Sequence, residues 1–208
     1  MKYKLVIFDF DGTLADTFPY VLHIMDQVSE KFDLKKVDRS EIDTLRTFDA
    51  RMVMKHLDIP FWKVPAISKH VMKLVAEDIN FFSLFDGVDQ LLRDLSNRGV
   101  KLGVVTSNSY ENVQKILGPE NAALIHYYEC GVQIFGKQAK LKKILQQSDT
   151  RASETLCIGD EIRDIQAAQK VNIPFGAVAW GYTNLEALKA YSPAEVFIKV
   201  GEIAERIA

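Results

Sequence analysis

The chain has 208 residues, of which 48% are hydrophobic, and its 26 lysine and arginine residues nearly balance its 28 aspartate and glutamate residues, for a net charge of -2. This length can bury a sizeable core, but the missing basic excess argues against nucleic-acid binding driven by phosphate attraction. Two lone cysteines, Cys130 and Cys157, exclude a disulfide scaffold and a cysteine-based zinc site, and no apolar run approaches about 18 residues, so we expect a cytoplasmic protein that binds no membrane.

The N-terminal part predicts one short strand and then a helical segment. Residues 2–8 are mostly apolar, and the carboxylates of Asp9 and Asp11 follow at once, before a Gly12 that favours a turn. Beyond these, apolar residues recur at helical spacing over 16–32, 41–45, 50–57 and 66–78. No pattern between residues 15 and 83 predicts a strand, so we expect an all-helical insert there.

After residue 83 the chain alternates between helical and strand patterns. Strands are predicted over 101–105, 155–158, 175–179 and 195–198, and helices over 88–95, 109–117, 140–147, 163–170, 185–191 and from residue 200. Such alternation is typical of a parallel sheet covered by helices on both faces. We therefore expect an α/β fold with a Rossmann-like parallel sheet core built from residues 1–14 and 84–208. The all-helical cap domain over 15–83 is inserted into it.

Polar side chains follow four of the predicted strands or lie in adjacent loops. They are Asp9 and Asp11, Thr106, Lys137, and Asp160 and Asp164. Ligands bind at the carboxyl edge of such sheets, so we expect these side chains to meet there. Two carboxylates about 4 Å apart repel by roughly 4 kcal/mol at an effective dielectric of 20. A hard cation relieves this repulsion, and oxygen ligands favour Mg²⁺, an ion that in turn points to phosphate substrates.

These motifs together resemble those of the haloacid dehalogenase superfamily. The resemblance rests on the segments Asp9-Phe10-Asp11-Gly12-Thr13-Leu14, the strand into Thr106, Lys137, and Gly159-Asp160-Glu161-Ile162-Arg163-Asp164. The helical insert and the segment 178–182 resemble the phosphoglycolate-phosphatase-like branch. The resemblance implies a haloacid dehalogenase-like core with a helical cap.

The resemblance also implies a mechanism. Asp9 would attack phosphorus to form an aspartyl-phosphate, and Asp11 would act as the general acid and base. Dehalogenase members lack an aspartate at the second position, so Asp11 favours phosphoryl transfer. The ligands of Mg²⁺ would be the carboxylate of Asp9, the main-chain carbonyl of Asp11 and Asp160, with Asp164 binding directly or through water.

Substrate contacts follow from the same resemblance. Thr106 would bind a phosphoryl oxygen, helped by the main-chain N–H of Ser107 or Asn108 at a helix start. Lys137 would offset the charge of Asp9 and the phosphoryl group. Many relatives carry Lys-Pro at this motif, whereas Gln138 follows Lys137 here, so Lys140 stays an alternative. In the insert, Arg46, Arg51 and Lys55 are candidate substrate contacts, and Arg46 lies where caps often contact substrate.

These observations predict a Mg²⁺-dependent phosphatase that acts on a small phosphorylated metabolite, with the insert as a lid, as a monomer or homodimer. The alternatives are a phosphomutase with the same catalytic residues, a 2-haloacid dehalogenase, and a non-enzymatic phospho-acceptor module. Residues 131–138 also fit the spacing GxxxxGK of a nucleotide-binding loop, but Gln138 cannot supply the hydroxyl that such a loop offers to Mg²⁺.

Overall fold

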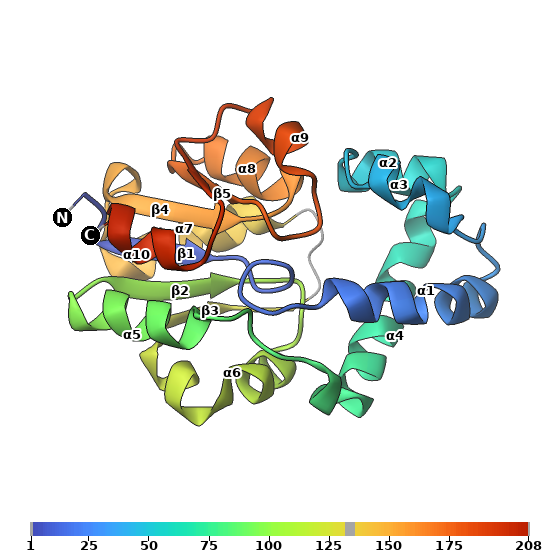
Figure 1. Ribbon diagram of the computed structural model, residues 1–208, viewed down its shortest axis with the longest axis horizontal. Helices are drawn as coiled ribbons and strands as arrows, with labels where there is room; N and C mark the ends of the chain where they lie inside the picture. The colour runs from blue at the N-terminus through green and yellow to red at the C-terminus, as the bar shows by residue number, and fades with distance from the viewer. Residues whose placement is uncertain (1, 132–135, 208) are drawn as a thin grey trace.

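The first strand lies near the middle of a six-stranded parallel sheet, in the order β3-β2-β1-β4-β5-β6. Its register sets Ile7 opposite Gly103 on one side and Cys157 on the other. The strands are β1 Leu5–Phe8, β2 Lys101–Val105, β3 Tyr127–Glu129, β4 Thr155–Gly159, β5 Phe175–Val178 and β6 Glu195–Phe197. The computed structural model describes residues 2–131 and 136–207 (Figure 1). Within them the predicted α/β fold is confirmed.

Helices cover both faces of the sheet. One face carries α5 (Val88–Asn97), α6 (Tyr110–Leu124) and α10 (Gly201–Ile207), and the other carries α7 (Lys137–Ser148), α8 (Ile162–Gln169) and α9 (Leu185–Lys189). A short 3-10 helix, η4 (Ala152–Glu154), leads into β4. α6 is broken at Gly118, whose φ of 72° lies in the left-handed region and is followed by a proline. The carboxyl ends of the strands all face the same edge, because every pair is parallel.

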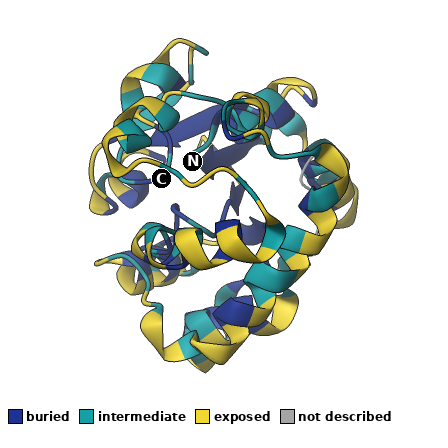
Figure 2. Ribbon diagram, turned by 90° about the vertical axis from the view of Figure 1, so that its right-hand side faces the viewer, coloured by how far each residue is buried: buried dark blue, intermediate teal, exposed yellow. Residues whose placement is uncertain are grey.

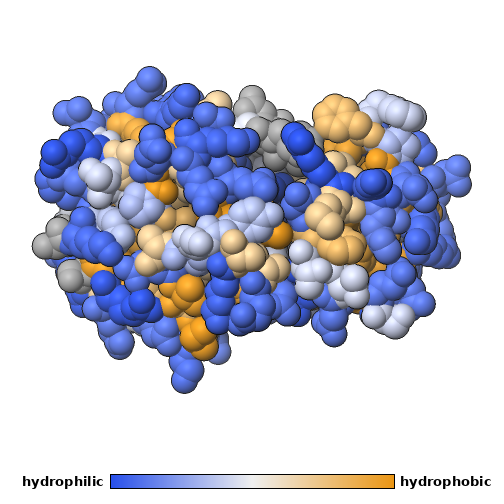
Figure 3. Space-filling view, turned by 90° about the horizontal axis from the view of Figure 1, so that it is seen from above, coloured by the Kyte–Doolittle hydropathy of each residue, from blue (hydrophilic) through white to orange (hydrophobic). Residues whose placement is uncertain are grey.

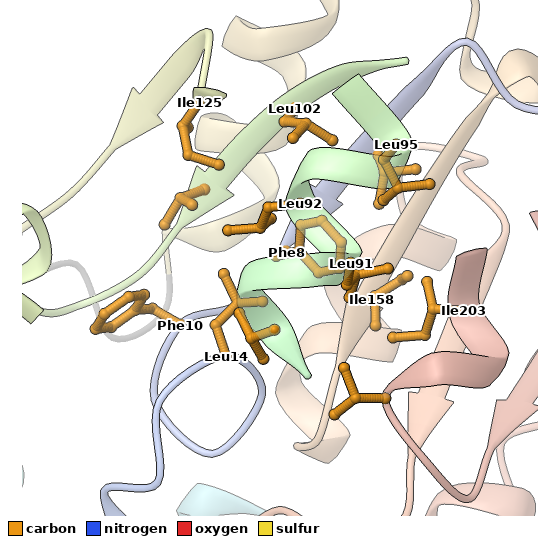
Figure 4. Close-up of a cluster of buried hydrophobic side chains, with 14 of the residues drawn as sticks. Phe8, Phe10, Leu14, Leu91, Leu92, Leu95, Leu102, Ile125, Ile158 and Ile203 are labelled. Carbon is orange, nitrogen blue, oxygen red and sulfur yellow. The ribbon is translucent and has the colours of Figure 1, made fainter. Parts of the chain in front are cut away.

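Two buried apolar clusters hold the layers together. In the cluster of Figure 4, Phe8 of β1 and Leu102 of β2 pack against Leu92 and Leu95 of α5, and all four side chains are almost fully buried. Phe10 and Leu14 belong to the same cluster although they follow β1. The loop that carries Asp9 and Asp11 is therefore anchored in the core by its apolar residues, which fixes where its carboxylates lie.

The segment between β1 and α5 is helical and lies beyond the carboxyl edge of the sheet (Figure 1). It comprises α1 (Phe18–Phe32), α2 (Ile42–Leu45), α3 (Ala50–His56) and α4 (Val64–Glu77), with 3-10 helices η1 (Arg39–Glu41), η2 (Phe61–Lys63) and η3 (Ile79–Phe81). Figure 2 shows the strands of the sheet mostly buried and the helices of this segment mostly exposed or half-buried. Hereafter residues 15–83 are called the helical insert.

Some elements differ from the sequence prediction. β3 was not expected, because three residues with no apolar alternation carry too weak a pattern. α7 begins at Lys137 rather than at residue 140, so this lysine lies in the first turn of a helix. α4 begins at Val64 rather than at residue 66, and Pro65 lies in its first turn, where the missing N–H of proline costs no helical hydrogen bond.

The outer surface seen in Figure 3 is mostly hydrophilic, and its hydrophobic side chains lie in scattered patches. Among the described residues, no helix combines the length and apolar character needed to cross a membrane.

Candidate active site

The carboxylates of Asp9 and Asp11 lie on the tight loop that follows β1. Asp9 is buried, and its Oδ1 accepts a hydrogen bond of 2.8 Å from the N–H of Phe10. The loop turns at Gly12, whose φ of 78° lies in the left-handed region. A Cβ at this position would lie 2.4 Å from Asp160 Oδ2, so the loop also approaches the end of β4 very closely. Glycine meets both requirements.

Asp9 lies close to two carboxylates, one that follows the neighbouring strand β4 and one in the helix after it. Asp160 follows β4 directly, Asp164 lies in the first turn of α8, and one oxygen of each lies within 4.8 Å of the others and of Asp9. All three are buried. Burial first, and then the charge of Asp164, raise the pKa of Asp9 well above 3.8. Burial likewise raises the pKa of Asp160 to about 8 with help from Glu161 and Asp164. Burial and the neighbouring carboxylates thus both oppose ionisation of Asp9 and Asp160.

Lys137 lies inside this cluster. Its Nζ is 2.7 Å from Asp9 Oδ2 and also contacts Asp164 Oδ1. Burial would lower the pKa of Lys137, but Asp164 and Asp9 hold it above 10.5. The ammonium is close to Asp9 Oδ2 but not in a direction that makes a hydrogen bond, so among the described residues that oxygen has no hydrogen-bond donor.

Lys140, the sequence alternative, has a different environment. One turn further along α7, its Nζ donates hydrogen bonds of 2.7 Å to the main-chain carbonyls of Thr106 and Gly131. Burial lowers its pKa. Lys140 thus supports the loop after β2, whereas Lys137 provides the positive charge beside Asp9.

Asp11 points to the loop after β2. Its Oδ2 accepts a hydrogen bond of 3.0 Å from Thr106 Oγ1, and its Oδ1 accepts one of 3.1 Å from Asn108 Nδ2. Burial raises the pKa of Asp11 above 3.8, while the hydrogen bonds from Thr106 and Asn108 act in the opposite direction. Burial and the two hydrogen bonds thus act in opposite directions on the pKa of Asp11, which lies two residues after Asp9. Such a carboxyl group is suited to donate and accept a proton.

Asp160 is held by groups from two other segments. Its Oδ1 accepts a hydrogen bond of 2.6 Å from Thr13 Oγ1, and its Oδ2 accepts one of 2.7 Å from the N–H of Tyr182. The segment around Tyr182 reaches this close only because residue 181 is glycine. A Cβ at Gly181 would lie 2.1 Å from Asp160 Cβ.

Arg163 stands at the rim of the cluster. Its Nη2 donates a hydrogen bond of 2.6 Å to Glu161 Oε1, and its Nε is buried without a hydrogen-bond partner among the described residues. Burial would lower its pKa, but Glu161, Asp164 and Asp9 raise it. Asp164 is in turn fixed by a capping box, in which the Glu161 N–H donates to Asp164 Oδ2 at 3.1 Å.

Arg46 joins the helical insert to the core. Its Nε and Nη2 donate hydrogen bonds of 3.0 Å to the main-chain carbonyls of Tyr182 and Gly181. Its own carbonyl accepts a 2.7 Å hydrogen bond from the N–H of Asn184. The guanidinium also lies over the ring of Phe18, 5.2 Å from its centre. These bonds place Arg46 against the segment that holds Asp160.

The structure brings most of the candidates predicted from the sequence together in two groups. Asp160, Asp164 and Lys137 surround Asp9, and Thr106 and Asn108 contact Asp11. Ser107 is half-buried, and α6 begins later than expected, with Ser109 as its N-cap. Residues 132–135 of the GxxxxGK segment lie outside the described residues.

Sequence reasoning missed the side-chain roles of Thr13, Asn108 and Arg163 and the main-chain role of Tyr182. Thr13 and Arg163 lie within the quoted motifs, and their position there is the signal that could have found them. Asn108 was expected to contribute only its main-chain N–H. No local pattern indicated that the Tyr182 N–H would meet Asp160.

The cluster fits a divalent cation. Its donors are carboxylate oxygens, which hard ions such as Mg²⁺ prefer. Asp9 Oδ2 lacks a hydrogen-bond donor among the described residues, and burial, followed by the charges of neighbouring carboxylates, raises the pKa of Asp9 and of Asp160. An added cation at this point would favour their ionised forms.

Known proteins resemble this chain over nearly its whole length. The model of the haloacid dehalogenase-like hydrolases matches residues 6–178. A phosphoglycolate phosphatase from Synechococcus elongatus is 29% identical, over 91% of this chain and 90% of that protein. The pyrophosphatase PpaX from Bacillus mycoides is 26% identical, over 98% of this chain and 96% of that protein.

Among solved structures, a haloacid dehalogenase-like family hydrolase from Streptococcus pneumoniae has a TM-score of 0.82 at 18% identity, and it covers 100% of this chain and 99% of its own. At that identity the likeness shows the fold alone. The family match covers most of the sequence, including Asp9, Thr106, Lys137 and Asp160. The chain therefore belongs to the haloacid dehalogenase-like hydrolases, as a phosphoglycolate-phosphatase-like member of that family.

Proposed function

We propose that this protein is a Mg²⁺-dependent phosphatase that hydrolyses a small phosphate monoester through an aspartyl-phosphate on Asp9. The observation that carries the proposal is the convergence of Asp9 with Asp160, Asp164 and Lys137 at the carboxyl edge of the sheet. The phosphoglycolate phosphatase and pyrophosphatase among its relatives support a substrate with a phosphoryl group. We place the reaction in the cytoplasm.

Mg²⁺ would be held by the carboxylates of Asp9, Asp160 and Asp164 and by the main-chain carbonyl of Asp11. When bound, it would offset the negative charge that a phosphate ester brings to this cluster. Lys137 contributes a second positive charge beside Asp9, and this charge opposes the effect of burial on the pKa of Asp9 and so favours its ionised, nucleophilic form.

The first half of the reaction transfers the phosphoryl group to Asp9. An oxygen of Asp9 forms a bond to phosphorus while the bond to the ester oxygen breaks. Asp11, whose raised pKa lets it retain a proton, gives that proton to the departing alkoxide. The hydroxyl of Thr106, which donates a hydrogen bond to Asp11, would bind a phosphoryl oxygen, helped by the N–H of Ser107 or of Asn108, which here donates to Thr106 Oγ1.

The second half regenerates the enzyme. Asp11, now ionised, removes a proton from a water molecule, and the water oxygen attacks phosphorus as the bond to Asp9 breaks. Inorganic phosphate leaves, and Asp11 ends with the proton it started with. The helical insert, which Arg46 fastens to the segment 181–184, would serve as a cap that limits the access of bulk water.

Replacing Asp9 with asparagine tests the nucleophile. With p-nitrophenyl phosphate and Mg²⁺, Asp9→Asn should release no phosphate while its circular dichroism spectrum stays that of the parent protein. The matched control is Asp16→Asn, because Asp16 is a half-buried acid on the same loop outside the carboxylate cluster. Equal turnover in Asp9→Asn and Asp16→Asn would overturn the proposal.

Product analysis separates the remaining alternatives. A phosphatase yields inorganic phosphate and the free alcohol, a phosphomutase yields an isomeric sugar phosphate, and a dehalogenase releases halide from a 2-haloacid without metal. A phospho-acceptor module keeps its acyl-phosphate without continued phosphate release.

A further inference from the structure

The helical insert lacks a closed core of its own. α1 and α4 pack together through one small buried cluster, which comprises Tyr20, Ile24, Val28, Leu74 and Val75. α2 and α3 contribute no residue to it. Their apolar side chains instead surround a cavity of about 490 Å³ that also borders α1 and α4.

The wall of this cavity is apolar. It includes Leu22 and Met25 of α1, Leu45 of α2, and Val53 and Met54 of α3, all of which stay only half-buried. Protein interiors are normally close-packed, and an apolar void forfeits the dispersion contacts of its lining. A cavity of this size matches the roughly 300–1,000 Å³ of small-molecule sites, which are mainly apolar with a few polar groups at one point.

Those polar groups lie where the cavity meets the core. Glu161, Arg163, Tyr182 and Thr183 line the cavity, and they surround the end of β4 that carries Asp160. The buried Arg163 Nε, which has no hydrogen-bond partner among the described residues, offers a donor to an oxygen atom of a ligand. The polar end of the cavity therefore lies beside the segments that hold Asp160, although the carboxylates of the cluster do not themselves line it.

We propose that the substrate carries an apolar alkyl or aryl group on its phosphoryl oxygen, and that this group occupies the cavity of the insert. The proposal rests on the phosphatase function proposed above and adds the chemical class of the alcohol. A ligand with an apolar body and an oxygen-bearing head fits the mainly apolar wall of the cavity and the polar residues beside the segment that holds Asp160.

A series of straight-chain alkyl phosphates tests the proposal in the parent protein. With Mg²⁺ present, kcat/KM should rise from methyl through propyl to hexyl phosphate by about twofold to fourfold per methylene. The upper value corresponds to roughly 0.8 kcal/mol for each buried methylene. An equal kcat/KM for methyl and hexyl phosphate would overturn the inference and leave the phosphatase function standing.

Two neighbouring substitutions on α3 then locate the effect. Val53→Trp fills the cavity, whereas Met52→Trp adds the same side chain at a position that is 49% exposed and outside the lining. The ratio of kcat/KM for hexyl over methyl phosphate should fall at least tenfold in Val53→Trp and stay unchanged in Met52→Trp. An unchanged ratio in a folded Val53→Trp would contradict the assignment, and Val53→Phe serves if the larger substitution does not fold.

Failure of the underlying function has a different signature. If no ester in the series, p-nitrophenyl phosphate included, releases phosphate with Mg²⁺, the proposed phosphatase function fails and this inference fails with it. If short polar esters such as phosphoglycolate are hydrolysed faster than hexyl phosphate, only the assignment of the apolar group is overturned.

Discussion

Replacing Lys137 with methionine would remove the positive charge from the carboxylate cluster while keeping a side chain of similar length. The lost ammonium lies 2.7 Å from Asp9 Oδ2 and also contacts Asp164. Both carboxylates are buried, so water replaces the lost partner poorly. Removing one partner of a buried ion pair costs about 3–5 kcal/mol. We expect the free energy of unfolding to fall by that amount near neutral pH in the absence of metal.

The loss should grow as pH rises. Lys137 is one of the charges that lower the pKa of Asp9, although burial and Asp164 hold that pKa above 3.8. Without the ammonium, folded Asp9 retains its proton to still higher pH, whereas the unfolded chain loses it near 3.8. The folded state then binds more protons than the unfolded state. The free energy of unfolding therefore falls with rising pH between these two pKa values.

Urea unfolding of Lys137→Met, followed by circular dichroism over a pH series with and without Mg²⁺, measures both effects. The control is Lys142→Met on the exposed side of the same helix, which should change the free energy of unfolding by less than about 0.5 kcal/mol. Mg²⁺ should recover part of the stability of Lys137→Met by supplying positive charge. A metal-free Lys137→Met as stable as Lys142→Met would refute the electrostatic reasoning.

Three further substitutions test single contacts. Gly181→Ala places a Cβ 2.1 Å from Asp160 Cβ and should lower the free energy of unfolding by about 1–3 kcal/mol. An unchanged urea midpoint would contradict the close approach of residue 181 to Asp160. Asn108→Ala removes a hydrogen bond that lowers the pKa of Asp11, so the alkaline limb of the kcat/KM profile should move to higher pH; an unmoved limb would remove Asn108 from this role. Arg46→Ala removes two hydrogen bonds between insert and core, so amide hydrogen exchange in α2 should quicken while that in β1 stays the same, and equal protection in the two proteins would argue against a fastening role.

Much of the fold could be predicted because its signal is local. The apolar runs of β1, β2 and β4 and the helical spacing of α1 are properties of consecutive residues, and their alternation indicated a parallel sheet. β3 was not predicted because it is a short strand without an apolar run or an alternating apolar pattern. Lys137 was expected in a loop but begins α7, and this start one turn earlier is what points its side chain towards Asp9.

The choice between Lys137 and Lys140 depended on the tertiary structure. The two lysines are three residues apart and chemically identical, so the sequence motif left both open. They lie about a turn apart on the same helix, and the contacts of α7 with the core direct one to a carboxylate and the other to two main-chain carbonyls.

By itself, the sequence indicated that Asp9 and Asp160 meet, because each follows a strand and parallel strands end at one edge. The tertiary structure alone decided what holds them in place. The hydrogen bond from Thr13 to Asp160 joins residues 147 apart, and the donation from Arg46 to Gly181 joins residues 135 apart. The tertiary structure also leaves a cavity between the helices of the insert. The apolar faces of these helices can be seen in the sequence, but the distances between the helices cannot. Spacing along the chain encodes periodicity and strand ends, whereas distances between remote segments depend on how all the side chains pack at once.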